Sequence, residues 1–320
     1  MSQVTDPIIL DSTGQAILAA IQALEPGLVT TTAAGKLAPN AECIEDGFIK
    51  LASAANKGLM SAAFAALLES PEALVFTKGK ALTQNAGFHN SIYRGKNLGT
   101  SVTAAQYAAI SAGTFDDMFI GDYWVIGGVN WRIAAFDYWL HCGDTECTTH
   151  HVVIVPDSAL ATAKMNNSNI TTGGYIGCDY YTGANSNTGK STAQTAINNA
   201  FGSAHILSHR QLLSNAVTDG KASGWAWYDS TFELMNESMV YGAPVCGAEK
   251  TGDANFNVGI DKSQLPLFRL DPSRITNRAN WWLRDVVSAA HFADVHGNGH
   301  ASDNLASAAF GVRPAFGIKA

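Results

Sequence analysis

From about residue 115 onward, short stretches of the chain alternate between apolar and polar positions, a period of two that predicts β-strands. The stretch DYWVIGGVNWRIAAFDYWL (122–140) alternates on both sides of Gly127 and Gly128, which predicts a β-hairpin with these glycines at its turn. Other apolar runs predict further strands, namely HHVVIVPD (150–157), LPLFRL (265–270), NWWLRD (280–285) and FGVRPAFGI (310–318).

Two segments in the same region have helical spacing instead. They are TAQTAINNAFGSAHILS (192–208) and STFELMNESMVYG (230–242). Strands and helices do not alternate regularly along the chain, as they would in a parallel α/β sheet, so we expect an α+β fold.

The first part of the chain has a different pattern. It contains no tryptophan, is rich in Ala, Leu, Thr and Ser, and predicts three helices near residues 11–25, 53–70 and 103–111, joined by Gly- and Thr-rich connections. A short helix with one apolar stripe is marginal by itself, so it needs a partner to pack against. We therefore expect residues 1–114 to form an elongated helix-and-loop connector that oligomerises, and residues 115–320 to form a separate domain.

Composition narrows the function classes. The chain has 320 residues, is 47% hydrophobic and only 15% charged, and has a net charge of −7 without a long basic run. Nucleic-acid binding is therefore not expected. The start, MSQVTDPIILDSTGQ, lacks the basic region of a secretory signal, and no apolar run is long enough for a membrane span, so no membrane insertion is expected. Five cysteines scattered over the chain do not indicate a disulfide scaffold.

The segment 280–316 concentrates polar and imidazole side chains between two apolar ends. Trp281, Trp282 and Leu283 stand at its front, and Val312 and Phe316 stand behind it. Ends fixed by burial would leave the residues between them free to vary and to contact a partner, which suits a display loop for recognition. The expected binding residues, here called the candidate surface, are Asp285, Ser288, His291, Asp294, His296, Asn298, His300, Ser302, Asp303, Asn304 and Ser307.

Several motifs taken together resemble a known group of proteins. The motifs are YWVIGGVNWRIAAFDYWL, THHVVIVPD, SGWAWYDSTFELM, PLFRLDP and WWLRD…FADVHGNG…GVRPAF. Over roughly residues 115–320 they resemble the C-terminal domains of phage and prophage tail or fibre proteins. Those domains are similar in plan to the C-type-lectin-like fold, which is shared with formylglycine-generating enzymes and with the variable proteins of diversity-generating retroelements, such as the major tropism determinant. The stretches NKGLMSAA and DPIILDSTGQAI resemble linker segments of phage tail fibres.

The resemblance implies a receptor-binding protein at the tip of a virion tail, often a homotrimer. Its partners would be a host cell-surface protein or glycan and other tail proteins of the virion. It implies no catalysis and no cofactor. In the variable proteins the diversified residues lie just before a final strand, where Gly311, Val312 and Arg313 stand here. The segment 285–310 contains no Lys, Glu, Gln, Met or Trp, which is compatible with adenine mutagenesis of Asn codons.

Other interpretations remain open. HCGDTECTTHH (141–151) has metal-ligand side chains without a standard zinc spacing, so we expect a hairpin loop and no metal. ANSNTGKS (184–191) fits a loose phosphate-loop pattern, but no buried strand precedes it, so we expect an ordinary helix start. A serine of the candidate surface could pair with one of its histidines as nucleophile and base, although no nucleophile elbow is present. Two further alternatives are a purely structural tail or baseplate protein and a glycan hydrolase.

Overall fold

The computed structural model describes residues 85–247 and 263–320, together with five short strands nearer the N-terminus. The chain divides into two compact units, Met1–Leu82 and Thr83–Ala320. In the first unit the strands are β1 (Ile8–Ile9), β2 (Val29–Thr31), β3 (Lys36–Pro39), β4 (Ile44–Glu45) and β5 (Phe48–Ile49). Strand β3 pairs with β1 and β2, and β4 pairs with β5. The helices expected near residues 11–25 and 53–70 lie outside the described residues.

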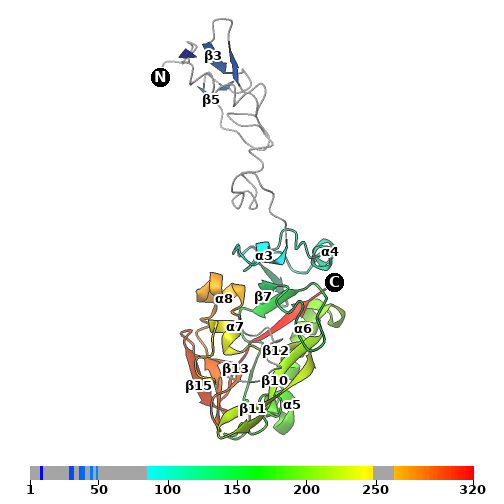
Figure 1. The fold of residues 1–320 in the computed structure, drawn as a ribbon, viewed down its shortest axis with the longest axis vertical. Coiled ribbons are helices and arrows are strands. Elements are labelled where there is room, and N and C mark those ends of the chain that lie inside the picture. The colour runs from blue at the N-terminus through cyan, green and yellow to red at the C-terminus, as the bar shows by residue number, and fades with distance from the viewer. Residues whose placement is uncertain are drawn as a thin grey trace. The chain divides into compact units, whose positions relative to one another are not determined.

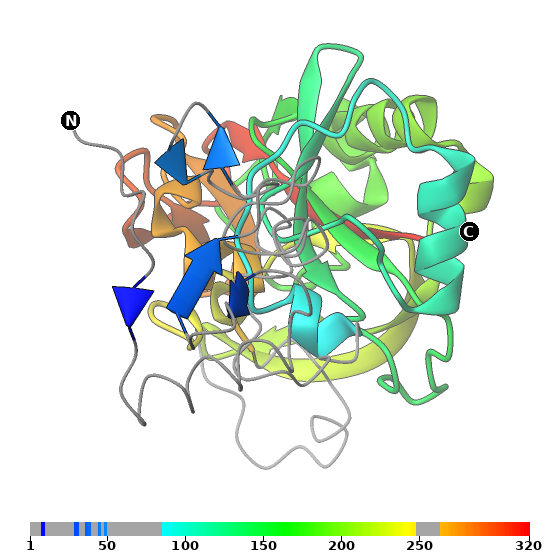
Figure 2. The same cartoon turned by 90° about the horizontal axis from the view of Figure 1, so that it is seen from above.

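The second unit is a mixed α+β fold with mostly sheet structure (Figures 1 and 2). One five-stranded sheet has the order β12-β17-β8-β7-β6 and is called here the buried sheet. Its strands are β6 (Tyr123–Ile126), β7 (Val129–Phe136), β8 (Val152–Pro156), β12 (Phe232–Leu234) and β17 (Pro314–Ile318).

The other five-stranded sheet has the order β15-β14-β13-β16-β9 and is called here the open sheet. Its strands are β9 (Ala161–Ala163), β13 (Trp281–Val286), β14 (His291–Val295), β15 (Ala301–Leu305) and β16 (Phe310–Val312). Strands β10 (His209–Thr218) and β11 (Lys221–Ser230) form a separate two-stranded ribbon.

The helices are short and lie around the sheets. They are α3 (Ala86–His89), α4 (Ala104–Ala112), α5 (Asp179–Thr182), α6 (Gly189–Phe201), α7 (Glu237–Tyr241) and α8 (Pro266–Leu270), with 3-10 turns at Ala184–Ser186, Ser203–His205 and Pro272–Arg274. Helices α4 (teal) and α6 (light green) lie at the outer edge of the unit in Figure 2.

Local sequence explains several of these elements. Gly127 and Gly128 both have positive φ, which the tight turn between β6 and β7 requires. Thr103 begins α4 with a capping box that includes Gln106, and Gly113 ends it in the left-handed conformation. The hairpin within 122–140, the strand within 150–157 and the helix near 103–111 are confirmed, and the helix expected over 192–208 is confirmed only as far as Phe201, where α6 ends.

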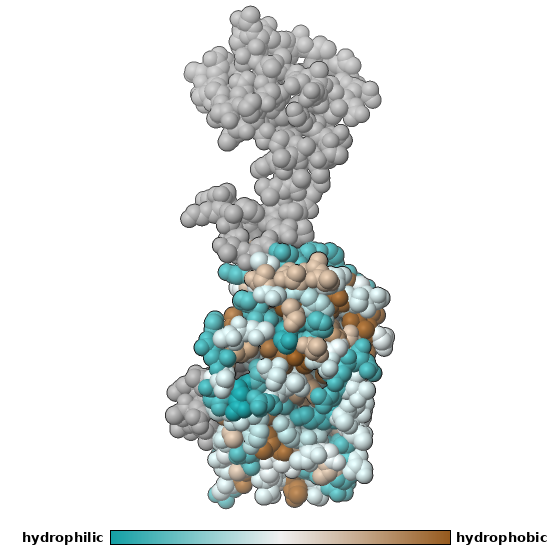
Figure 3. Space-filling view, turned by 90° about the vertical axis from the view of Figure 1, so that its right-hand side faces the viewer, coloured by the Kyte–Doolittle hydropathy of each residue, from teal (hydrophilic) through white to brown (hydrophobic). Residues whose placement is uncertain are grey.

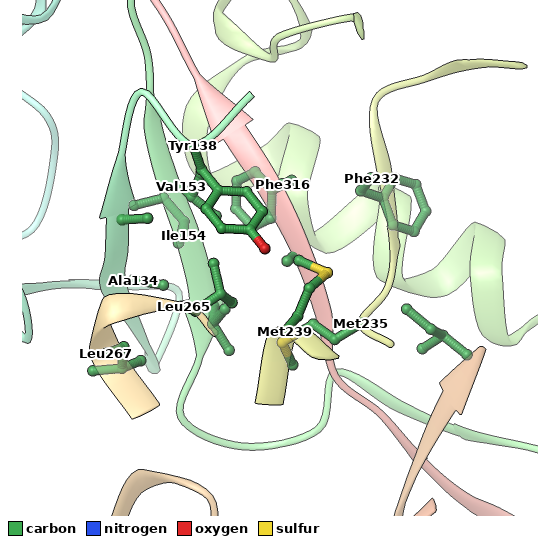
Figure 4. Packing of buried hydrophobic residues seen from close by; sticks show 14 of the residues in the cluster. Ala134, Tyr138, Val153, Ile154, Phe232, Met235, Met239, Leu265, Leu267 and Phe316 are labelled. Carbon is green, nitrogen blue, oxygen red and sulfur yellow. The ribbon is translucent and has the colours of Figure 1, made fainter. Parts of the chain in front are cut away.

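The core is built from the buried sheet and the elements that cover it. Figure 4 shows Tyr138, Leu265 and Met239 close together beside the strands that carry Val153 and Phe316. The Phe316 ring lies 5.7 Å from the Trp131 ring and 5.5 Å from the Phe201 ring, measured between centroids. Such edge-to-face contacts join α6 to the sheet.

Three sequence expectations about this unit were wrong. The run LPLFRL forms helix α8, because Pro266 occupies its first turn, where a missing N–H is harmless. STFELMNESMVYG begins as strand β12, which pairs with β17, and turns helical only after Asn236 caps α7. The β10–β11 ribbon was missed, although Asp219 and Gly220, both with positive φ, occupy its turn.

The expected boundary at residue 114 is also wrong. The second unit begins at Thr83, and residues 85–114 belong to it. Tyr93 and Asn97 pair with Ile120 and Tyr123 through isolated bridges, and the Arg94 guanidinium binds the buried Asp122 carboxylate at 2.6 Å. Long-range pairing of this kind leaves no signal in the local composition on which the boundary was based.

Candidate functional site

The segment expected as an irregular display loop is mostly regular β-structure. Asp285 lies in β13, Ser288 in the β13–β14 connection, His291 and Asp294 in β14, and Ser302, Asp303 and Asn304 in β15. His296, Asn298 and His300 lie in the β14–β15 turn, and Ser307 follows β15. The loop expectation is wrong because the two strands complete the edge of the open sheet, where their backbone groups find partners.

The pleat divides these residues between two faces. In the antiparallel register His291 pairs with Leu305, and Ala293 pairs with Asp303. Side chains alternate along a strand, so His291 and Asp303 share one face, and Asp294 lies on the other. His291 Nδ1 lies 2.6 Å from Asp303 Oδ2, and both side chains are about one-third exposed, at 35% and 36%. This diagonal cross-strand pair forms an accessible polar patch.

Asp294 has a different environment and is fully buried. Its carboxylate accepts hydrogen bonds from Asn280 Nδ2 at 3.1 Å and Asn304 Nδ2 at 2.9 Å. Burial raises the pKa of Asp294. The expectation that Asp294 contacts a partner is therefore corrected, because it joins β14 to its neighbours from inside the protein.

The β14–β15 turn carries the exposed members of the candidate surface. His296, Asn298 and His300 are all exposed. Asn298 Oδ1 lies 3.0 Å from His296 Nδ1 and 2.5 Å from His300 Nδ1, and the two imidazole rings stack with centroids 4.6 Å apart. The turn thus holds two exposed, stacked imidazoles on either side of the Asn298 side-chain oxygen.

Behind the candidate surface lies a carboxylate that sequence reasoning missed. Glu237 is buried, and its two oxygens accept backbone N–H groups of Val245, Cys246 and Gly247 at 2.7–2.9 Å. Asp285 Oδ2 accepts the Glu237 N–H at 2.8 Å, so Asp285 has a structural contact in addition to its place in the candidate surface. Only folding brings Asp285 next to Glu237, because the two residues lie far apart in the sequence and belong to no recognisable motif.

The geometry does not favour nucleophilic catalysis at this surface. Ser288 Oγ accepts the backbone N–H groups of Ala290 and His291, and within the described ranges no serine hydroxyl bonds to a ring nitrogen of His291 or His300. Burial and the nearby Glu237 carboxylate raise the pKa of the Cys246 thiol, which disfavours its reactive thiolate.

The other chemical motifs have structural partners. His141 pairs with Glu146, His150 with Asp137, and His151 Nδ1 lies 2.9 Å from the Thr149 carbonyl. In the described part of the chain, no group of three or more His, Cys, Asp or Glu side chains could hold a metal ion. Cys142, Cys147, Cys178 and Cys246 are free thiols.

Comparison with known proteins gives one family match. Residues 207–320 match the family described as Domain of unknown function (DUF6273). The matched segment runs from just before β10 to the C-terminus, so it includes the entire candidate surface. Searches of curated proteins and of solved structures found no match. Within the described residues, no helix has the length and apolar character needed to cross a membrane.

Proposed function

We propose that this protein is a receptor-binding protein of a phage or prophage tail, and that the β14–β15 edge and turn of the open sheet contact the host cell. In this proposal the second unit has a C-type-lectin-like plan, and the chain assembles as a homotrimer on the virion. One observation carries the proposal: His296, Asn298 and His300 are exposed on a turn that directly follows the buried part of β14.

Strands β13 and β14 have a source of stability that does not involve the turn. Trp281, Trp282, Phe292 and Val295 are fully buried. The Trp282 indole N–H also donates to the Ala163 carbonyl at 2.8 Å, which ties β13 to β9 across the sheet. Because the turn side chains add little to this packing, exchanging them changes the surface while the sheet persists. Such tolerance supports a recognition role and is compatible with diversification by a retroelement.

A glycan hydrolase fits the same surface less well. Hydrolysis of a glycosidic bond needs two carboxyl groups on either side of one bond. Asp294 and Asp303 are on neighbouring strands but project to opposite faces, and Asp294 is buried between two amides. Recognition needs only the exposed patch, so it is the simpler assignment.

Weak contacts at one surface would suffice if three copies act together. Linked sites increase overall avidity without new contacts, provided that they can bind simultaneously. In the proposed trimer, residues of the first unit would hold the copies together and attach them to other tail proteins. The receptor would be a host cell-surface protein or glycan.

The proposal is tested by adsorption. Purified full-length protein should compete with the parent virion for host cells, and a variant with His296→Ala, Asn298→Ala and His300→Ala should compete at least tenfold less. A matched control replaces exposed His141 and Thr148 by alanine, and it should compete like the unchanged chain. Undiminished competition by the triple variant would reject the proposed surface.

A further inference from the structure

A polar cavity lies at the edge of the open sheet opposite β15. It has a volume of about 380 Å³ and opens between β9 and the start of α6. Four strand spacings separate β9 from β15 in the sheet order, which corresponds to about 19 Å. In Figure 1, α6 and β15 lie on opposite sides of the second unit. The cavity is therefore distinct from the candidate surface.

Several polar side chains in the cavity wall are exposed and have no hydrogen-bond partner within the described protein. The side chains of Thr162, Lys164, Asn167, Ser186 and Thr188 line it, and none makes a hydrogen bond or ion pair within the described ranges. Together they offer hydroxyl, amide and ammonium groups that donate and, except for the ammonium, also accept. A ligand with many hydroxyls matches this mixture.

The walls of the cavity are held in place by other residues. Asp179 Oδ2 accepts the Asn167 backbone N–H at 2.6 Å and the Asn185 Nδ2 group at 2.9 Å. Asn187 Nδ2 donates to the Lys164 carbonyl at 2.7 Å, which ties the start of α6 to the segment after β9. At Gly189 an added Cβ would lie 2.4 Å from the Ala163 Cβ, so the two segments approach too closely for any larger residue. A prebuilt cavity loses little entropy when it binds a ligand.

The cavity is not suited to a nucleotide phosphate, although ANSNTGKS forms part of its wall. A phosphate loop needs its lysine to face the ligand. Here Lys190 turns inward, where its Nζ lies 3.3 Å from both Glu233 carboxylate oxygens and 3.3 Å from the centre of the Tyr181 ring. The Asp179 carboxylate in the cavity wall would also repel an anion, and it balances the charge of Lys164.

An apolar ligand would find little to contact, because the apolar part of the wall is limited to alanines and Gly189. Figure 3 likewise shows a face of the second unit in which brown areas are scattered among teal and pale ones. We propose that this cavity binds a neutral saccharide unit, a site that is additional to the candidate surface and does not depend on it.

The size and chemistry set the expected affinity. A volume of about 380 Å³ is at the lower end of small-molecule sites, sufficient for one or two sugar rings. Without an aromatic ring in its wall to stack on the sugar, the cavity should bind with a Kd on the order of millimolar.

The test is saturation-transfer NMR on the full-length chain. The probes are glucose, galactose, mannose, N-acetylglucosamine and their disaccharides, with methyl phosphate, whose C–H protons are observable, as the anionic probe, each at about ten times the millimolar Kd. At least one saccharide should give a transfer signal. The variant Ser186→Ala with Thr188→Val should weaken that binding at least tenfold, because it removes two exposed hydroxyls of the wall while their backbone contacts stay. The matched control, Ser203→Ala with Thr148→Val, changes exposed hydroxyls elsewhere and should leave binding unchanged.

Three results would overturn the saccharide site. They are no signal from any saccharide, equal binding by the Ser186/Thr188 variant, and tighter binding of methyl phosphate than of every sugar. The triple variant at His296, Asn298 and His300 should retain saccharide binding. A negative result for the saccharide site can therefore be distinguished from a negative result for the receptor surface. The NMR test changes Ser186 and Thr188, whereas the adsorption assay tests other residues.

Discussion

The two five-stranded sheets of the second unit differ in how their strands are covered. In the buried sheet, every residue of β8, β12 and β17 is buried. In the open sheet, β13 is almost entirely buried, whereas no residue of its edge strand β15 is. The buried sheet therefore lies in the core of the unit. The open sheet changes from buried to accessible over its three strands β13, β14 and β15. A protein with this division can change its edge without losing its fold.

The same contrast appears in the polar side chains. In the interior, Arg313 donates to the Pro156 and Arg274 carbonyls, and Arg284 donates to Gln211 Oε1, as expected for buried arginines near the strand ends. At the edge, the histidines of the β14–β15 turn bond only to Asn298 among described side chains. These two interior arginines are fixed by long-range partners, while the histidines of the turn depend on a local one.

The largest expected effect comes from replacing one apolar residue in each sheet, which tests the difference in burial between the two sheets. Phe316→Ala in β17 should lower the free energy of unfolding by about 3–5 kcal/mol, because it removes a fully buried ring that contacts Trp131 and Phe201. Leu305→Ala in β15 should lower it by less than about 0.5 kcal/mol, because Leu305 is 43% exposed. Denaturant unfolding of both variants measures the difference, and similar losses would contradict it.

A second prediction concerns pH and the buried histidines. Burial lowers the pKa of His209 to about 3 and also lowers the pKa of His151, and the Trp139 ring lies against both imidazoles. In the unfolded chain a histidine titrates near pH 6.5. Below that pH the unfolded state binds more protons, so stability should fall as the pH drops from about 6.5 to 4.5. The slope should reach about 1.4 kcal/mol per pH unit for each such histidine.

The measurement is the free energy of unfolding across that pH range. His209→Gln should reduce the slope of unfolding free energy against pH by about 1.4 kcal/mol per pH unit, the contribution of one histidine. The control Thr148→Ala should leave the slope unchanged. An unchanged slope in His209→Gln would show that this imidazole does not remain neutral in the folded protein.

A third prediction compares how much Asp294 in β14 and Asp303 in β15 each contribute to the free energy of unfolding. Asp294→Ala should lower the free energy of unfolding by about 1–3 kcal/mol, because it leaves the Asn280 and Asn304 amides without their acceptor. Asp303→Ala, at a one-third exposed position, should lower it by less than about 1 kcal/mol. If thermal melting shows the reverse order, the assignment of faces is wrong.

The smallest expected effect is at the turn itself. Replacing His296, Asn298 and His300 by alanine should change the free energy of unfolding by less than about 0.5 kcal/mol for each residue, because all three side chains are exposed. Thermal melting of the triple variant checks this together with the adsorption assay. A large loss of stability would make the turn part of the structural frame.

The local sequence pattern was sufficient to predict those elements whose structure depends on residues close together in the sequence. The alternation around Gly127 and Gly128 predicted the β6–β7 hairpin, and the helix expected near 103–111 is α4, because turn geometry and helix capping depend on residues a few positions apart. The same pattern identified Trp281 and Trp282 as core anchors, since a pair of large apolar side chains has few exposed alternatives.

Tertiary structure decided what depends on partners distant in sequence. Only the pairing of β14 with β13 and β15 shows that Asp294 is inside while Asp303 is outside, because a shift of one position moves a side chain to the other face. The inward turn of Lys190 toward Glu233 agrees with the helix start that the sequence predicted for ANSNTGKS, whereas only the tertiary structure shows the polar cavity beside it. The sequence by itself determined the α+β class and the hairpin, strands and helices that have clear local signals. Long-range packing determined the strands and helices that the sequence pattern missed, and which polar residues are exposed.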